Sequence, residues 1–242
     1  MDERISSGIE GLNQLLDGGF LAGRNILVIG GPGSGKSILG TQFIVNNIGE
    51  EPSIYVSLDY SKKTFLNDMK NFGWDFAAYE EDKKFIFIDG SSIRKIPQTK
   101  SVDGVVYSEE NLSLEDILDL IQLNIDKIGA KKLVLDDLTG LLFRYPSDSQ
   151  RRSAMLHMFD SFSQMNITSL VISEATMYDI ERTINTEEFL SDGVIRMVML
   201  KDGTRSIQIS KMRGVSSDNK PHPYTISSTG IEAFATEEIF SS

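Results

Sequence analysis

One short segment of the chain has residue types and a spacing that suit the binding of phosphate groups. It fits the pattern G-x-x-x-x-G-K-[ST] and consists of Gly30, Gly31, Pro32, Gly33, Ser34, Gly35, Lys36 and Ser37. Glycines let successive backbone amides turn towards phosphate oxygens, a lysine can reach the β and γ phosphates, and a serine hydroxyl can ligate magnesium. The alternative is a glycine-rich turn that binds nothing, but such a turn does not require Lys36 and Ser37. We therefore predict that residues 31–37 hold nucleotide phosphates and that Ser37 binds Mg2+.

A phosphate loop of this kind works with a carboxylate at the end of a neighbouring strand, which holds magnesium through its water shell. Asp136 is placed for this role because it follows the apolar residues 133–135, and Asp137 stands beside it. Either acid could be the partner, and the first acid after the apolar run is preferred. The alternative is a strand-ending aspartate that caps a turn. We predict Asp136 as the second metal-binding residue.

The elements around this loop follow from two short apolar runs at residues 25–29 and 54–58. Both are rich in Ile and Val and are bounded by Gly, Pro or Asp, which is typical of parallel strands buried on both faces. Residues 37–48 between them have the pattern of a crossover helix. The glycine-rich loop therefore lies between a buried strand and a helix, where phosphate binding requires it.

Strands and helices continue to alternate along the chain. Ser61 is expected to cap one helix, Ser113 and Asp116 resemble a capping box, and residues 148–165 form a further helical pattern. Additional strands are expected at residues 85–88, 132–135 and 168–172. The polar stretch of residues 89–111 is interpreted as a long surface loop.

The pattern changes after Gly193. Residues 194–200 and 206–211 flank an Asp202-Gly203 pair, which is a favoured turn between antiparallel strands. We predict an α/β fold with a mostly parallel, doubly wound sheet and a C-terminal antiparallel hairpin at one edge. Residues 1–242 are expected to form a single domain.

Composition limits the classes of function. The chain has 40% hydrophobic and 24% charged residues, and no apolar run is long enough to cross a bilayer, so no membrane role is expected. It has no cysteine and no secretory leader pattern, which favours the cytoplasm. The formal net charge of -11 argues against nucleic acid as a partner.

Three segments resemble signatures of the KaiC-like family of RecA-fold ATPases. They are residues 4–20 (RISSGIEGLNQLLDGGF), 187–194 (EEFLSDGV) and 211–214 (KMRG), and the likeness extends from about residue 4 to residue 234. Asn13 departs from the family pattern, in which Asp is usual. The chain thus looks like a single-domain member. The resemblance implies a RecA-like sheet, ATP as the nucleotide, and a homo-oligomeric ring, commonly a hexamer, with the nucleotide at subunit boundaries.

The resemblance also implies roles for Lys211 and Arg213. In rings of this family the corresponding cations reach the phosphates that the neighbouring subunit binds, where they stabilise charge on the γ-phosphate. The alternative is that both residues are ordinary cations on the solvated end of a hairpin.

One departure bears on catalysis. The family carries two adjacent glutamates after its second strand, and one of them orients or deprotonates the attacking water. Asp59 and Tyr60 stand at the matching positions. Asp59 keeps a carboxylate but is one methylene shorter, so hydrolysis is expected to be slow or to need a partner. Asp59 could equally help to cap the following helix. A weaker prediction places Glu174 near the γ-phosphate.

These observations lead to the hypothesis of a Mg2+-dependent ATPase that hydrolyses ATP slowly to ADP and phosphate. The catalytic residues would be Lys36, Asp59, Lys211 and Arg213, and the role would be regulatory or signalling, with a protein partner still to be identified. Two alternatives stay open. One is an ATP-binding regulatory module with negligible turnover, and the other is a DNA recombination accessory protein, because fold does not fix function.

Overall fold

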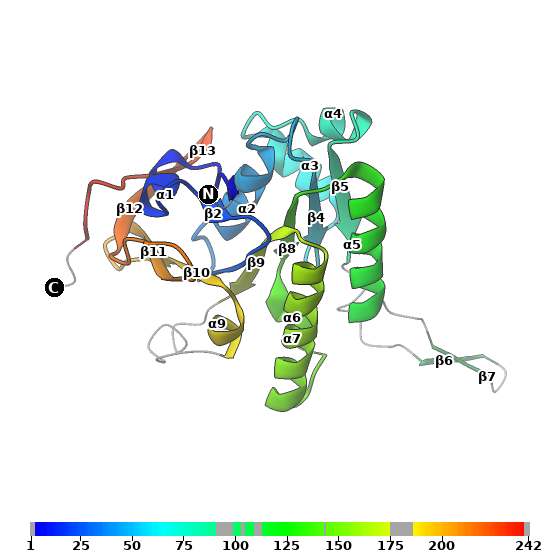
Figure 1. Ribbon diagram of the computed structural model, residues 1–242. Coiled ribbons are helices and arrows are strands. Elements are labelled where there is room, and N and C mark those ends of the chain that lie inside the picture. The colour runs from blue at the N-terminus through cyan, green and yellow to red at the C-terminus, as the bar shows by residue number, and fades with distance from the viewer. Residues whose placement is uncertain are drawn as a thin grey trace.

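The computed structural model describes residues 3–90, 99–102, 105–108, 113–142, 144–174 and 186–239, and Figure 1 labels their helices and strands. Nine strands of the described residues form one sheet in the order β13-β12-β11-β10-β3-β9-β8-β4-β5. Each pair of neighbours from β10 to β5 is parallel. These strands are β3 Asn25–Gly30, β4 Ser53–Ser57, β5 Phe85–Asp89, β8 Lys132–Asp136, β9 Thr168–Glu174 and β10 Gly193–Met199. The predicted mostly parallel sheet is confirmed.

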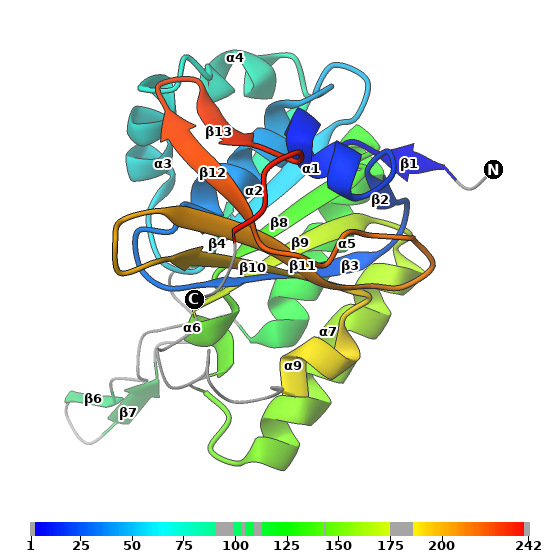
Figure 2. The ribbon, with the colours of Figure 1, turned by 90° about the vertical axis from the view of Figure 1, so that its left-hand side faces the viewer.

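Helices cover both faces of this sheet. Figure 2 shows α1 to α4 above the sheet and α6 and α7 below it. Their bounds are α1 Glu10–Leu15, α2 Lys36–Val45, α3 Lys62–Lys70, α4 Phe76–Glu81, α5 Leu114–Ile128, α6 Leu138–Leu142 and α7 Asp148–Gln164. Alternate residues of β3 point to opposite faces of the sheet. Ile26 and Val28 pack into the hydrophobic core on the face covered by α2, and Leu27 and Ile29 pack into the core on the face covered by α5 and α7. The doubly wound arrangement follows from this burial on both faces.

The predicted helix caps are confirmed. The Oγ atom of Ser61 accepts a hydrogen bond from the Thr64 amide at the start of α3. Ser113 and Asp116 form a capping box at the start of α5, and Gly129 ends this helix in the left-handed conformation with φ of 66°. Local sequence therefore sets where these helices begin and end.

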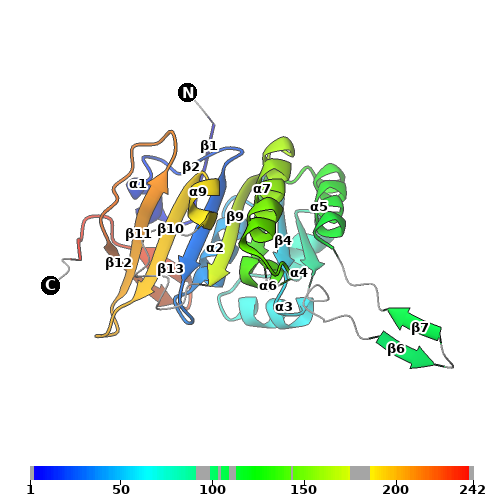
Figure 3. The same cartoon turned by 90° about the horizontal axis from the view of Figure 1, so that it is seen from below.

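The antiparallel end of the sheet is larger than the hairpin alone. The predicted hairpin is present as β10 and β11 (Arg205–Met212), which pair antiparallel. Two further antiparallel strands, β12 (His222–Ser227) and β13 (Gly230–Ala233), extend the sheet beyond β11. Figure 3 shows this series of strands beside β3. The short strands β1 (Arg4–Ile5) and β2 (Phe20–Leu21) form a separate antiparallel pair.

The stretch interpreted as a long loop contains structure of its own. Strands β6 (Thr99–Val102) and β7 (Val105–Ser108) pair antiparallel and lie away from the main sheet (Figures 1 and 3). Residues 91–98, 103–104 and 109–111 of that stretch are outside the described residues. No helix in the described ranges has the length and apolar character needed to cross a membrane.

Candidate functional site

The glycine-rich loop connects the end of β3 at Gly30 to the start of α2 at Lys36. Gly33 and Gly35 have φ angles of 75° and 89°, which lie in the left-handed region that favours glycine. A Cβ atom added at Gly31 or Gly33 would meet nothing within 4 Å, so this part of the loop faces open space. The loop has room for a bound group on its outer side.

Hydrogen bonds inside the loop converge on one carbonyl group. The Oγ atom of Ser34 donates to the Gly31 oxygen at 2.8 Å, and the Nζ atom of Lys36 donates to the same oxygen at 3.1 Å. Burial lowers the pKa of Lys36, and the negative charges of Glu174, Asp136 and Asp137 oppose that shift. Lys36 thus lies among carboxylates with its ammonium group directed along the loop.

The strand register brings the phosphate loop, Asp136 and Glu174 to the carboxyl ends of the parallel strands. Gly30 pairs with Glu174, and Ser57 pairs with Asp136, so the carboxyl ends of β3, β9, β4 and β8 meet there. In sheets of this kind ligands bind at the carboxyl ends of the strands. The phosphate loop, Asp136 and Glu174 are therefore neighbours in space.

The two adjacent aspartates have different surroundings. The Oδ1 atom of Asp137 accepts a hydrogen bond from the Gly140 amide at 2.9 Å, so Asp137 caps the start of α6. Asp136 is 3% exposed and its Oδ2 atom accepts hydrogen bonds from two tyrosines. Between the two acids, Asp136 remains the better candidate for the metal.

The tyrosines that contact Asp136 were not predicted from the sequence. The Oη atom of Tyr55 donates to Asp136 Oδ2 at 2.6 Å, and that of Tyr60 donates to the same atom at 2.8 Å. The two phenol oxygens also lie against each other, but with both protons given to Asp136 neither phenol donates to the other. The Ser37 side chain lies beside Tyr60 and opposes the rise in the pKa of this phenol. Burial raises the pKa of both phenols, so they keep their protons and act as donors at neutral pH. The sequence offers one signal for this pair, which is a tyrosine three residues before Leu58 and another two residues after it.

Asp59 lies at the same end of the sheet, just beyond the carboxyl end of β4. Its side chain is exposed, and its amide donates to the Oγ atom of Ser57 at 3.4 Å. The N-cap of the following helix is Ser61. The helix therefore has a capping residue that does not depend on Asp59.

Lys211 and Arg213 lie at the opposite end of the sheet from the phosphate loop. Lys211 pairs with Val194, which pairs with Leu27 near the start of β3, whereas the loop follows the end of β3. Because β-strands rise by more than 3 Å per residue, these cations are remote from the phosphate loop of their own chain. The register therefore sets both cations apart from the residues of the loop.

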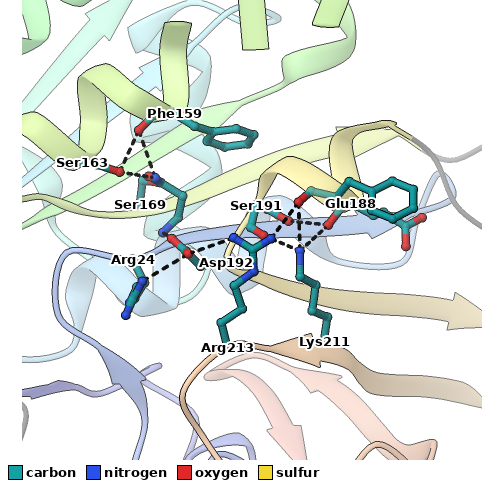
Figure 4. Close-up of polar contacts among 11 residues, drawn as sticks. Arg24, Phe159, Ser163, Ser169, Glu188, Ser191, Asp192, Lys211 and Arg213 are labelled. Carbon is teal, nitrogen blue, oxygen red and sulfur yellow. Dashed lines mark hydrogen bonds and ion pairs between the residues drawn. The ribbon is translucent and has the colours of Figure 1, made fainter. Parts of the chain in front are cut away.

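Both cations contact the end of helix α9 (Thr186–Leu190), as Figure 4 shows. The Nζ atom of Lys211 donates to the backbone oxygens of Glu188 at 2.7 Å and of Ser191 at 2.5 Å. The Nη2 atom of Arg213 donates to the Phe189 oxygen at 3.1 Å. The side chain of Arg213 is 54% exposed and lies 3.7 Å from Asp192. Lys211 is thus held within its own chain, while Arg213 is partly free to meet another surface.

The strand order, the glycine-rich loop after β3 and the carboxylate at the end of β8 define a P-loop protein of the RecA-like α/β class. The sequence profile of the family described as ATPase: KaiC matches residues 5–238. The chain therefore belongs to the KaiC family of RecA-like ATPases.

Relatives with known names agree with this assignment. A UPF0273 protein of Methanocaldococcus jannaschii is 32% identical over 234 residues, which is 95% of this chain and 95% of the relative. A circadian clock oscillator protein KaiC from Nostoc is 28% identical over 238 residues, which is 96% of this chain but 44% of the relative. The chain thus spans less than half the length of that KaiC protein and nearly the whole UPF0273 protein.

A solved structure has the same fold. The crystal structure of a KaiC-like protein from Pyrococcus horikoshii matches with a TM-score of 0.79 and 27% sequence identity. The match covers 97% of this chain and 100% of that protein. The predicted family and fold class are both confirmed.

Proposed function

We propose that this chain binds ATP with Mg2+ at the phosphate loop and hydrolyses it slowly to ADP and phosphate. One observation carries the proposal: the strand register sets the loop, Asp136 and Glu174 at one edge of the sheet, with Lys36 among the carboxylates. Residues 31–37 would hold the phosphates through backbone amides and Lys36.

The residues at this edge suit magnesium. The ion prefers oxygen ligands and keeps several waters, and the site offers the Ser37 hydroxyl and the Asp136 carboxylate. When bound with ATP, magnesium would neutralise charge on the β and γ phosphates. Ser37 would bind the ion directly, and Asp136 would accept hydrogen bonds from its waters.

Asp59 is the proposed base for the attacking water. The water oxygen would form a bond to the γ phosphorus while the bond from phosphorus to the β–γ bridging oxygen breaks. Asp59 would orient this water and take its proton, and Lys36 would stabilise charge on the leaving phosphate oxygens. The exposed position and short side chain of Asp59 support a slow reaction.

Lys211 and Arg213 are proposed to act on the nucleotide of a neighbouring subunit. Their place at the far end of the sheet supports this, because they cannot serve the loop of their own chain. A homo-oligomeric ring, with six subunits as in the family expectation, would put each nucleotide at a subunit boundary. The name of the Nostoc relative, a clock oscillator protein, supports a regulatory role for this chain as well.

The first test is phosphate release by the purified chain with Mg2+ and ATP, after its mass in solution has been measured. We expect slow turnover in a multi-subunit species. Lys36→Ala is the matched control and should abolish turnover, because the loop loses its only lysine. Turnover that persists in Lys36→Ala would assign the activity to a contaminant or to another site.

A second function, ATP binding with negligible turnover, is favoured by one observation. Tyr60 occupies the position next to Asp59 and makes its contacts with Asp136 and Tyr55. In this case ATP would act as a regulatory ligand. Asp59→Asn separates the two functions. If Asp59 is the base, this variant should lose about a hundredfold in turnover and keep its ATP affinity. Tight ATP binding with equally negligible turnover in both proteins would favour the binding module.

A further inference from the structure

The carboxylate of Asp136 is held by two phenol groups at one oxygen atom. Tyr55 is 0% exposed and donates from within β4, and Tyr60 donates from the segment that follows. Both hydrogen bonds go to Oδ2, so neither uses Oδ1 of the same carboxylate. A carboxylate that is fixed in this way presents its second oxygen in a defined direction.

Tyr60 also connects Asp136 to the phosphate loop. The Ser37 side chain lies beside the Tyr60 phenol, which in turn donates to Asp136. A serine hydroxyl that ligates a cation through its oxygen must give its proton to another acceptor. The phenol oxygen of Tyr60 has a lone pair for this proton, and accepting it would leave the lone pairs of Ser37 for the metal.

Packing fixes the positions of both phenol groups. The ring of Tyr60 stacks with Phe65 at a centroid distance of 6.4 Å, and the ring of Tyr55 stacks with Phe87 at 5.9 Å. These rings belong to the core under α3. The hydroxyl groups therefore stand on rigid supports, as a site with defined geometry requires.

We propose that Tyr60, supported by Tyr55, is a positioning residue of the magnesium site that orients the Ser37 hydroxyl and the Asp136 carboxylate together. This inference rests on the proposed function, because it assigns the ion to these two residues. Hydrogen-bond partners of metal ligands fix ligand orientation, and their loss typically weakens metal binding by 10-fold to 100-fold. Tyr60 belongs to this class of residue and needs no direct contact with the ion.

The test uses Tyr60→Phe, which removes the hydroxyl and keeps the stacked ring. Binding of a fluorescent ATP analogue is measured in EDTA and during titration with Mg2+. We expect unchanged affinity in EDTA and an increase of about tenfold in the Mg2+ concentration that gives half of the metal-dependent tightening. Tyr79→Phe is the matched control, because Tyr79 is also partly buried against this core and packs on Phe76. It should behave like the wild type.

Tyr55→Phe removes the other donor to Oδ2 and provides a second variant in case the first does not fold. It should shift the Mg2+ titration in the same direction. The inference is overturned if neither variant shifts this titration, if the shift is towards tighter Mg2+ binding, or if Tyr60→Phe weakens binding equally in EDTA. A wild-type chain that binds no ATP analogue would instead reject the proposed function.

Discussion

Single glycines of the phosphate loop have different constraints. Gly35 has φ of 89°, and a Cβ atom there would lie 2.7 Å from the Cδ1 atom of Ile226. Gly31 faces open space, and its φ angle is not positive. The conformation of the loop therefore depends on Gly35 more than on Gly31.

Gly35→Ala should destabilise the nucleotide-free chain by about 1–2 kcal/mol, because alanine is strained in the left-handed region. Gly31→Ala is the matched control and should stay within about 0.5 kcal/mol of the wild type. Urea unfolding followed by circular dichroism measures both. Equal stability of the two variants would contradict a loop that is fixed in the left-handed conformation at Gly35.

The candidate site could be predicted from the sequence only where its residues are close along the chain. Residues 30–37 form a local pattern, and Asp136 is predictable because it directly follows an apolar run. The contact of Tyr55 with Asp136 joins residues that are 81 positions apart and depends on the pairing of β4 with β8. No local pattern encodes such a contact, so only the folded structure reveals the role of the two tyrosines.

At the scale of elements, Lys211 connects strand β11 to the end of helix α9. The last carbonyl groups of a helix lack partners within it and carry partial negative charge, so a nearby ammonium group stabilises them. Lys211 donates to the oxygens of Glu188, Phe189 and Ser191. This explains why Lys211 is not a simple solvated cation, whatever it does in an oligomer.

Lys211→Ala should lower the free energy of unfolding by about 1–2 kcal/mol, since charge-assisted hydrogen bonds to the helix end are lost. Chemical denaturation without nucleotide is the measurement. Lys201→Ala, at an exposed position in the turn between β10 and β11, is the control and should change stability by less than about 0.5 kcal/mol. If Lys211→Ala is as stable as this control, the contacts with α9 contribute nothing measurable.

The elements that were predicted and those that were missed differ in length and in local signal. Strands such as β3 and β8 have continuous apolar runs, and α5 has a capping serine and a terminal glycine. β1 and β2 have two residues each, too few to show a period, and β12 contains Pro223. β1 and β2 form because they pair with each other, and β12 forms because it pairs with β11 and β13. The local sequence does not reveal such partners.

At the scale of the whole molecule, the proposed catalytic groups lie at two opposite ends of one sheet. The phosphate loop, Asp59 and Asp136 are at the carboxyl ends of the parallel strands, and Arg213 is beyond the other end of β10. Each chain would then contribute the phosphate loop to one site and the cation to a second site. A head-to-tail contact between copies would complete each site and would generate a ring if the rotation closes.

Mixed oligomers test this arrangement directly. Lys36→Ala removes the loop function and Arg213→Ala removes the cation offered to the neighbour, so each variant alone should be inactive. Arg213 is preferred to Lys211 because its side chain is more exposed and makes fewer contacts with α9. In a random equal mixture, half of the loops and half of the facing cations are intact, so about a quarter of the wild-type phosphate release should return.

The control is the double variant Lys36→Ala with Arg213→Ala, mixed with either single variant. Neither mixture contains a complete interface. With Arg213→Ala, every intact loop faces a subunit without Arg213, and with Lys36→Ala no intact loop is present. Subunit exchange must be followed separately by energy transfer between labelled chains. Exchange without recovered activity would show that Arg213 does not act across a subunit boundary, and the cations at the far end of the sheet would then have a structural role only.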